Sequence, residues 1–142
     1  MGWGHLTAIA GAAALLSACA GTPVEAPVQP LAMCEAMSAG DEDLAGRLSR
    51  SGSEPGDFCA CFVKIEAGLD DGTRADTYAL MSKVIDMRAG TDRSTEDVAE
   101  LLEDDRDGSL YGFPEERLKR GAQPIEDALS RARRDPESCR AS

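Results

Sequence analysis

Apolar residues recur every three to four positions from residue 31 to residue 132, with polar residues between them. This spacing is that of one face of an α-helix, whereas no useful length of the chain alternates as a half-buried strand does. The clearest apolar stripe consists of Phe58, Phe62, Ile65 and Leu69. The pattern therefore predicts an all-α fold, a small bundle of about five helices.

Capping residues indicate where these helices begin. Asp57 and Thr73 suit the N-cap position, because short polar side chains accept hydrogen bonds from the amides of the first helical turn. Ser94 and Asp97 resemble a capping box, in which two side chains satisfy each other's backbone amides. Pro114, followed by two glutamates, is typical of a first helical turn.

The two ends of the predicted domain are less regular than its middle. Two short helical pieces, 31–38 and 41–48, precede the clearest stripe and are separated by Gly40. Near the other end, Pro124 falls inside the stripe that runs from Leu118 to Ala132. A proline inside a helix removes a backbone hydrogen bond, so Pro124 must kink this helix or start a new one.

The N-terminal segment has a different pattern. Residues 6–18 are apolar and rich in Ala and Leu, and they end in Leu16-Ser17-Ala18-Cys19. The run is too short to cross a bilayer, which requires roughly 20 residues, but it suits the apolar region of a secretion signal. Its last four residues resemble the lipobox of bacterial lipoproteins: an aliphatic residue, two small ones and a cysteine.

This resemblance covers about the first 19 residues and implies that residues 1–18 are a signal peptide cut just before Cys19. Cys19 then carries a diacylglycerol on its thiol and usually an acyl chain such as palmitate on its amino group, and no other cofactor is expected. In many Gram-negative lipoproteins an Asp directly after the lipidated cysteine is an inner-membrane retention signal. This chain has Ala20 at that position, which predicts the outer membrane if the cell is Gram-negative. Ala18-Cys19-Ala20 also fits the A-x-A pattern of ordinary cleavage, which would release a soluble periplasmic protein.

A proline-rich stretch separates the predicted lipid site from the helical pattern. Residues 21–30 read G-T-P-V-E-A-P-V-Q-P, and three prolines in ten residues oppose a helix. Such a segment is typical of a semi-extended spacer. The predicted organisation is a signal peptide over 1–18, a lipidated cysteine and tether over 19–32, and a helical domain over 33–142.

Charge narrows the classes of partner. The chain of 142 residues has a formal net charge of −11, and residues 1–18 contain no charged side chain. Because binding to phosphates requires clustered Lys and Arg, nucleic acid is not an expected partner. The expected partners are the lipid bilayer, through Cys19, and another protein of the cell envelope.

Five cysteines are present, an odd number for an exported protein. Assigning Cys19 to lipid leaves Cys34, Cys59, Cys61 and Cys139 as disulfide candidates. On a helix Cys59 and Cys61 point about 200° apart, so each is expected to bond a different partner. One should pair with Cys34 and the other with Cys139, in either combination. The alternative is that the C-x-C pair binds a soft metal such as Cu(I) or is redox-active.

Candidate catalytic chemistry is sparse. The only histidine, His5, lies in the predicted signal peptide. The mature chain therefore lacks histidine-based nucleophile systems, histidine general bases and His-ligated zinc. We expect no enzymatic activity, although carboxylate-only and thiol chemistry stay open.

An acidic segment resembles a calcium-binding loop. Glu103, Asp105 and Asp107 occupy positions 1, 3 and 5, and Gly108 occupies position 6. Position 12 requires a bidentate glutamate and is Pro114 here. The segment is therefore interpreted as an acidic turn between helices, with a weak calcium site as the lesser alternative.

These features together predict a membrane-anchored lipoprotein of the cell envelope that acts as a non-catalytic structural or protein-interaction module. The alternative function is thiol-based metal binding or redox chemistry at the C-x-C pair.

Overall fold

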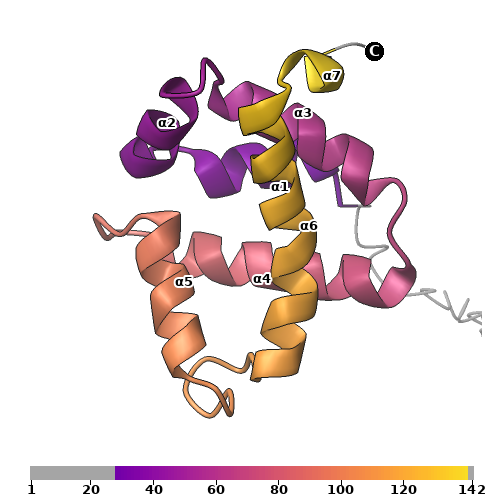
Figure 1. The fold of residues 1–142 in the computed structure, drawn as a ribbon. Helices are drawn as coiled ribbons and strands as arrows, with labels where there is room; N and C mark the ends of the chain where they lie inside the picture. Colours follow the sequence, from indigo (N-terminus) through magenta and orange to yellow (C-terminus); the bar gives the residue numbers. More distant parts are fainter. Residues whose placement is uncertain (1–27, 141–142) are drawn as a thin grey trace, which may run out of the picture.

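The computed structural model describes residues 28–140, which form seven α-helices and contain no strand (Figure 1). The helices are α1 (Pro30–Ser38), α2 (Glu42–Ser49), α3 (Pro55–Glu66), α4 (Asp71–Arg88), α5 (Thr95–Asp104), α6 (Glu115–Arg134) and α7 (Glu137–Arg140).

The all-α prediction is confirmed, but the prediction of a bundle of about five helices is not accurate. α6 crosses α4 steeply instead of lying along it (Figure 1). α3 and α4 both pack against α6, and α1 packs against α3 and α4. α7 is a single turn of four residues, too short to carry an apolar stripe that sequence inspection could recognise.

Two helices begin about one turn earlier than predicted. Glu54 is the N-cap of α3, and the carboxylate of Asp57 accepts a hydrogen bond from its amide at 2.8 Å. Asp70 is the N-cap of α4 and accepts from the amide of Thr73 at 2.9 Å. Asp57 and Thr73 are thus third residues of their helices rather than caps, because each helix begins at an N-cap residue one turn upstream.

Prolines also alter the predicted boundaries. α1 begins at Pro30, inside the predicted tether of 19–32, because the fixed φ of proline suits the first position of a helix. Pro114 is the N-cap of α6 rather than part of its first turn, and Pro124 lies inside α6, which continues as one helix. The predicted capping box of Ser94 and Asp97 at the start of α5 is confirmed.

The core lies where α1, α3, α4 and α6 meet, and α2 and α5 add side chains at its edge. Three phenylalanines, Phe58, Phe62 and Phe113, are buried in it, and its other apolar side chains are aliphatic or contain sulfur. The largest fully buried side chains include Phe58, Phe62, Met37, Leu48, Met81, Leu102 and Val98.

Two disulfides connect α3 to its neighbours on both sides. Cys59 bonds Cys34 of α1, with 5.5 Å between their Cα atoms, and Cys61 bonds Cys139 of α7, with 4.8 Å between theirs. All four cysteines are buried. The prediction that Cys59 and Cys61 bond different partners is confirmed, and the structure settles which partner belongs to each.

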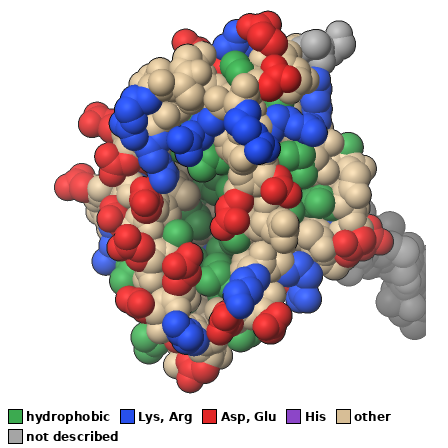
Figure 2. All heavy atoms as spheres, viewed as in Figure 1, with side chains coloured by type: hydrophobic (Ala, Val, Ile, Leu, Met, Phe, Trp, Pro, Cys, Tyr) green, Lys and Arg blue, Asp and Glu red, His purple; other side chains and the backbone are tan. Residues whose placement is uncertain are grey.

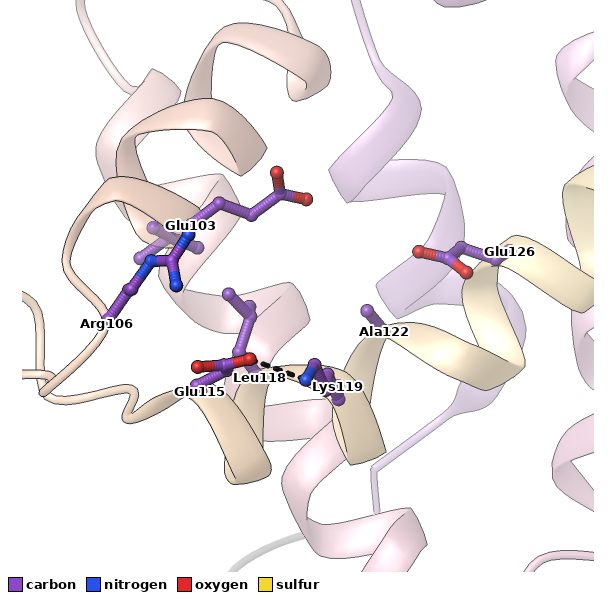
Figure 3. Close-up of a pocket in the computed structure, with 8 residues that line it drawn as sticks. Glu103, Arg106, Glu115, Leu118, Lys119, Ala122 and Glu126 are labelled. Atoms are coloured by element: carbon purple, nitrogen blue, oxygen red, sulfur yellow. Dashed lines mark hydrogen bonds and ion pairs between the residues drawn. The ribbon is translucent and has the colours of Figure 1, made fainter.

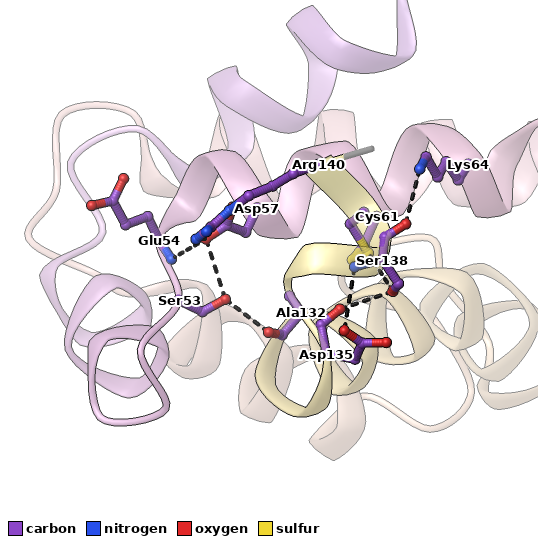
Figure 4. Close-up of a disulfide and its surroundings, with 10 residues drawn as sticks. Ser53, Glu54, Asp57, Cys61, Lys64, Ala132, Asp135, Ser138 and Arg140 are labelled. Atoms are coloured by element: carbon purple, nitrogen blue, oxygen red, sulfur yellow. Dashed lines mark hydrogen bonds and ion pairs between the residues drawn. A yellow bond between two sulfur atoms is a disulfide. The ribbon is translucent and has the colours of Figure 1, made fainter. Parts of the chain in front are cut away.

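Polar contacts also hold the C-terminal turn on α3 (Figure 4). The guanidinium of Arg140 donates to the buried carboxylate of Asp57, with Nη2 2.8 Å from Oδ2. This pairing lowers the pKa of Asp57 to about 2. The Ser53 hydroxyl donates to the carbonyl of Ala132 at 2.8 Å. The end of α6 and all of α7 are therefore fixed against the start of α3.

The crossing of α4 and α6 requires a glycine. A Cβ atom at Gly121 would lie 2.8 Å from the carbonyl oxygen of Asp76, closer than real side chains approach. Next to this contact, the Asp76 carboxylate pairs with Nε of Arg117 at 2.8 Å and Nε of Arg120 at 2.6 Å. Gly121 thus lets the helices touch, and the ion pairs fix their direction.

The disulfide pairing is testable with matched double variants. C34S/C59S and C61S/C139S each remove one bridge, so each exported protein should retain one disulfide and no free thiol. The mismatched variant C34S/C61S should expose two thiols, Cys59 and Cys139. Alkylation without reduction, followed by intact mass, distinguishes these states. Free thiols in the matched variants and none in the mismatched one would contradict this connectivity.

Candidate interaction groove

An open groove runs between α5 and α6 (Figure 2). It comprises two adjoining cavities of about 380 Å³ and about 230 Å³. Both cavities are lined by Leu102 and Glu103 of α5 and by Leu118, Ala122 and Glu126 of α6. Because these residues are shared, the two cavities form one continuous depression.

The floor of the groove is apolar and is built from four helices. Its main side chains are Met37 of α1, Leu80 and Val84 of α4, Leu102 of α5, and Ile125 and Leu129 of α6. Ile125 and Leu129 remain partly exposed, as do the small side chains Ala99 and Ala122 between the walls. Figure 2 shows hydrophobic side chains at the bottom of this hollow.

The rim of the groove is acidic in its middle. Glu100 and Glu103 project from α5, and Glu126 projects from α6; all three are exposed. Figure 3 shows the carboxylates of Glu103 and Glu126 pointing toward each other across the opening. Within residues 28–140, neither these two nor Glu100 forms an ion pair.

Charges at the two ends of the groove are largely matched. At the α2 end, Nη1 of Arg47 lies 2.8 Å from a carboxylate oxygen of Glu96. At the opposite end, Nζ of Lys119 lies 2.5 Å from a carboxylate oxygen of Glu115, and Arg106 also lines the wall. The unbalanced negative charge is therefore concentrated between the ends, over the apolar floor.

The position of α5 depends on a buried carboxylate. Asp41 accepts from the amide of Leu44, capping α2 at 2.9 Å, and from the amide of Thr95 at the start of α5, at 2.8 Å. Arg88, at the end of α4, lies 3.9 Å from the same carboxylate and donates to the carbonyls of Met37 and Ala39. This junction connects α1, α2, α4 and α5 at one point.

Burial raises the pKa of Asp41, whereas hydrogen bonds from Thr95 and Leu44 and the charge of Arg88 lower it. The lowering effects are together larger, so the pKa lies below its ordinary value of 3.8. Asp41 is therefore an ionised buried group whose charge is satisfied by two helix N-termini and one guanidinium.

Several predicted site residues are not part of the groove. The lipobox residues Leu16, Ser17, Ala18 and Cys19 lie outside the described residues, as does most of the predicted tether. Cys59 and Cys61 lie in the core on α3. In this oxidised state neither provides a thiolate to a metal, because each sulfur is bonded to another cysteine.

The acidic turn that resembles a calcium loop is held together by its own backbone. The buried carboxylate of Asp105 accepts from the amides of Leu110 and Tyr111, at 3.1 and 2.8 Å. Asp107 accepts from the amide of Ser109 at 3.0 Å. Between residues 28 and 140 there is no group of three or more acidic, Cys or His residues that could hold a metal ion.

The sequence analysis did not predict the groove, although the spacing of three glutamates indicates its acidic wall. Glu96, Glu100 and Glu103 are spaced by four and three residues, which places them on one face of α5 beside Ala99. Glu103 was interpreted as part of an acidic turn between helices, with a weak calcium site as the lesser alternative. Whether such an acidic stripe faces water or borders an apolar groove depends on where α6 crosses, and the sequence pattern does not contain that information.

No family model, no characterised protein and no solved structure matches this chain. The described helices include none that is long and apolar enough to cross a membrane. The assignment of a function therefore depends on the sequence features and on the geometry of the groove.

The Asp41 junction predicts a pH-dependent stability. D41N should lower the free energy of unfolding by about 1–2 kcal/mol at pH 7, because it weakens a helix cap and a buried charge pairing. The folded-state pKa of Asp41 is lowered, so its stabilisation is complete above pH 4 and is lost as the pH falls through that lowered value. The gap between wild type and D41N should therefore narrow from pH 5 to pH 2 in urea unfolding.

The control is D43N, which removes the same charge from the first turn of α2 at an exposed position. It should change stability by no more than a few tenths of a kcal/mol. A gap between wild type and D41N that stays constant at all pH values would show that the charge of Asp41 does not contribute.

Proposed function

We propose that this chain is the precursor of a bacterial lipoprotein, whose mature form is anchored through Cys19 and acts without catalysis as a protein-interaction module of the cell envelope. The groove between α5 and α6 is the observation that carries the interaction part of this proposal. An apolar depression with a polar rim is typical of surfaces that bind other macromolecules.

The cysteines support the anchoring part. Four of the five form two disulfides within the described residues, and the fifth is Cys19. A lipid on Cys19 would account for this remaining thiol. Disulfides are typical of proteins that fold in an oxidising compartment, which agrees with an export signal at residues 1–18.

Two further features favour binding over catalysis. No histidine lies beyond residue 5, and the groove presents carboxylates that face each other across an open mouth rather than a nucleophile paired with a base. The negative charge of the chain opposes adhesion to anionic lipid, so another protein is the favoured partner. In a Gram-negative cell, Ala20 favours the outer membrane, with the domain in the periplasm.

The anchor is tested by expressing the full chain in a Gram-negative host with labelled palmitate. The wild-type chain should incorporate label and sediment with the outer membrane, and C19A should lose the label. A20D should remain labelled but shift toward the inner membrane. A soluble, unlabelled wild-type chain cut after Ala20 would contradict the anchor and favour ordinary signal cleavage.

The interaction is tested in the same cells with a photo-crosslinking amino acid at Glu100, on the groove rim, or at Asp127, on α6 outside the groove. Glu100 should give one discrete adduct of higher mass, which is lost when I125S removes apolar floor. Asp127 should give none. Equal adducts from both positions, or none from either, would contradict a protein partner in the groove.

A further inference from the structure

We infer that the groove binds a helical segment of a partner protein that has an apolar face flanked by Lys or Arg. This inference rests on the proposed function and specifies the chemistry of its partner. It is carried by the juxtaposition of the apolar floor with three exposed and unpaired carboxylates, Glu100, Glu103 and Glu126.

Charge complementarity indicates that the partner segment carries positive side chains. Glu103 and Glu126 face each other across the mouth of the groove (Figure 3). A cationic side chain seated between them would be attracted to both carboxylates. Three basic residues line the groove: Arg47 and Lys119 are already paired with Glu96 and Glu115, and only Arg106 is left to offset the three unpaired carboxylates. The middle of the groove is therefore where a cation is favoured.

The lack of free backbone groups in the groove indicates that the partner segment is helical. The described residues contain no strand, so the groove offers no sheet edge to which an extended peptide could hydrogen-bond. A segment entering an apolar groove must then satisfy its own amides and carbonyls, which a helix does. α5 has ten residues and a length of about 15 Å, which matches about three turns of a bound helix.

A second copy of the same chain is disfavoured as the occupant. α5 forms one wall of the groove. If α5 of a second copy entered it, the Glu96, Glu100 and Glu103 side chains of the two copies would face each other. The formal net charge of −11 adds a general repulsion between copies. The partner is therefore expected to be a different, basic protein segment.

The test measures peptide binding to the processed full chain in phosphatidylcholine nanodiscs, with empty nanodiscs as blank. The probes are labelled helical peptides of about 14 residues, with Leu at helical spacing for the apolar face and Lys on both flanks. A second peptide has Glu in place of every Lys, and a third has the Lys peptide's composition in scrambled order. Binding is followed by fluorescence anisotropy at two salt concentrations.

The decisive variants differ only in where charge is removed. E103Q/E126Q neutralises the facing carboxylates, whereas D104N/D127N neutralises two exposed acids on the same two helices that do not line the groove. The Lys peptide should bind wild type and D104N/D127N equally, and E103Q/E126Q about tenfold more weakly with a smaller dependence on salt. The Glu and scrambled peptides should bind none of them.

Three outcomes would overturn the inference. Equal weakening in both double variants would show attraction to overall charge rather than to the groove. Binding of the Glu peptide as tight as that of the Lys peptide would show that the partner need not be basic. A groove-dependent dimer in sedimentation would show that the groove binds a second copy of the chain. The in-cell adduct at Glu100 is independent of these results, so the partner class can fail while the proposed function stands.

Discussion

The structure depends on α3 being held covalently from both sides. One residue separates Cys59 from Cys61, which sends their side chains to opposite sides of the helix, where one bonds α1 and the other bonds α7. In the chain-entropy account, closing loops of 25 and 78 residues contributes about 3.5 and about 4.5 kcal/mol. The free energy of unfolding of a small domain is roughly 5–15 kcal/mol, so the two bridges contribute a large part of it. They compensate for a core with few aromatic side chains.

The groove follows from how the remaining helices are placed on this framework. Gly121 lets α6 cross α4 in contact, and α5 packs against α4 beside this crossing. α5 is fixed at its start by Asp41 and at its end by the turn around Asp105 and Gly108. Gly108 has a φ of +71°, and a Cβ there would lie 2.5 Å from the nitrogen of Pro114. With both ends of α5 fixed and α6 held on α4, the two helices run side by side in Figure 1, and the groove lies between them.

The sequence predicted features that depend on neighbouring residues and missed those that depend on distant contacts. Apolar spacing was sufficient for the all-α class, and the capping box of α5 follows from Ser94 and Asp97 alone. The divergence of Cys59 and Cys61 follows from helix geometry, but their pairing required knowing that α1 and α7 lie on opposite sides of α3. The starts of α3 and α4 were placed too late because Asp57 and Thr73 were considered without the upstream N-cap residues Glu54 and Asp70.

The groove could not be predicted, for the same reason. The sequence places Glu103 beside Asp105 and Asp107, so it was interpreted as part of an acidic turn that resembles a calcium loop. The fold instead turns Asp105 inward to the backbone amides and leaves Glu103 on the face of α5 opposite Glu126. The two glutamates are far apart in the chain and are brought together only by the α4–α6 crossing. A local motif search therefore treats Glu103 as part of the turn and misses its place on the rim of the groove.

The position of the groove is compatible with the proposed anchor. The start of α1 and α5 lie on opposite sides of α6 in Figure 1, so a tether that enters at α1 reaches the domain away from the groove. The acidic domain is also repelled by anionic headgroups, which favours its standing clear of the bilayer. Under this anchoring the membrane does not compete for the groove, and a basic partner segment can approach it from the aqueous side.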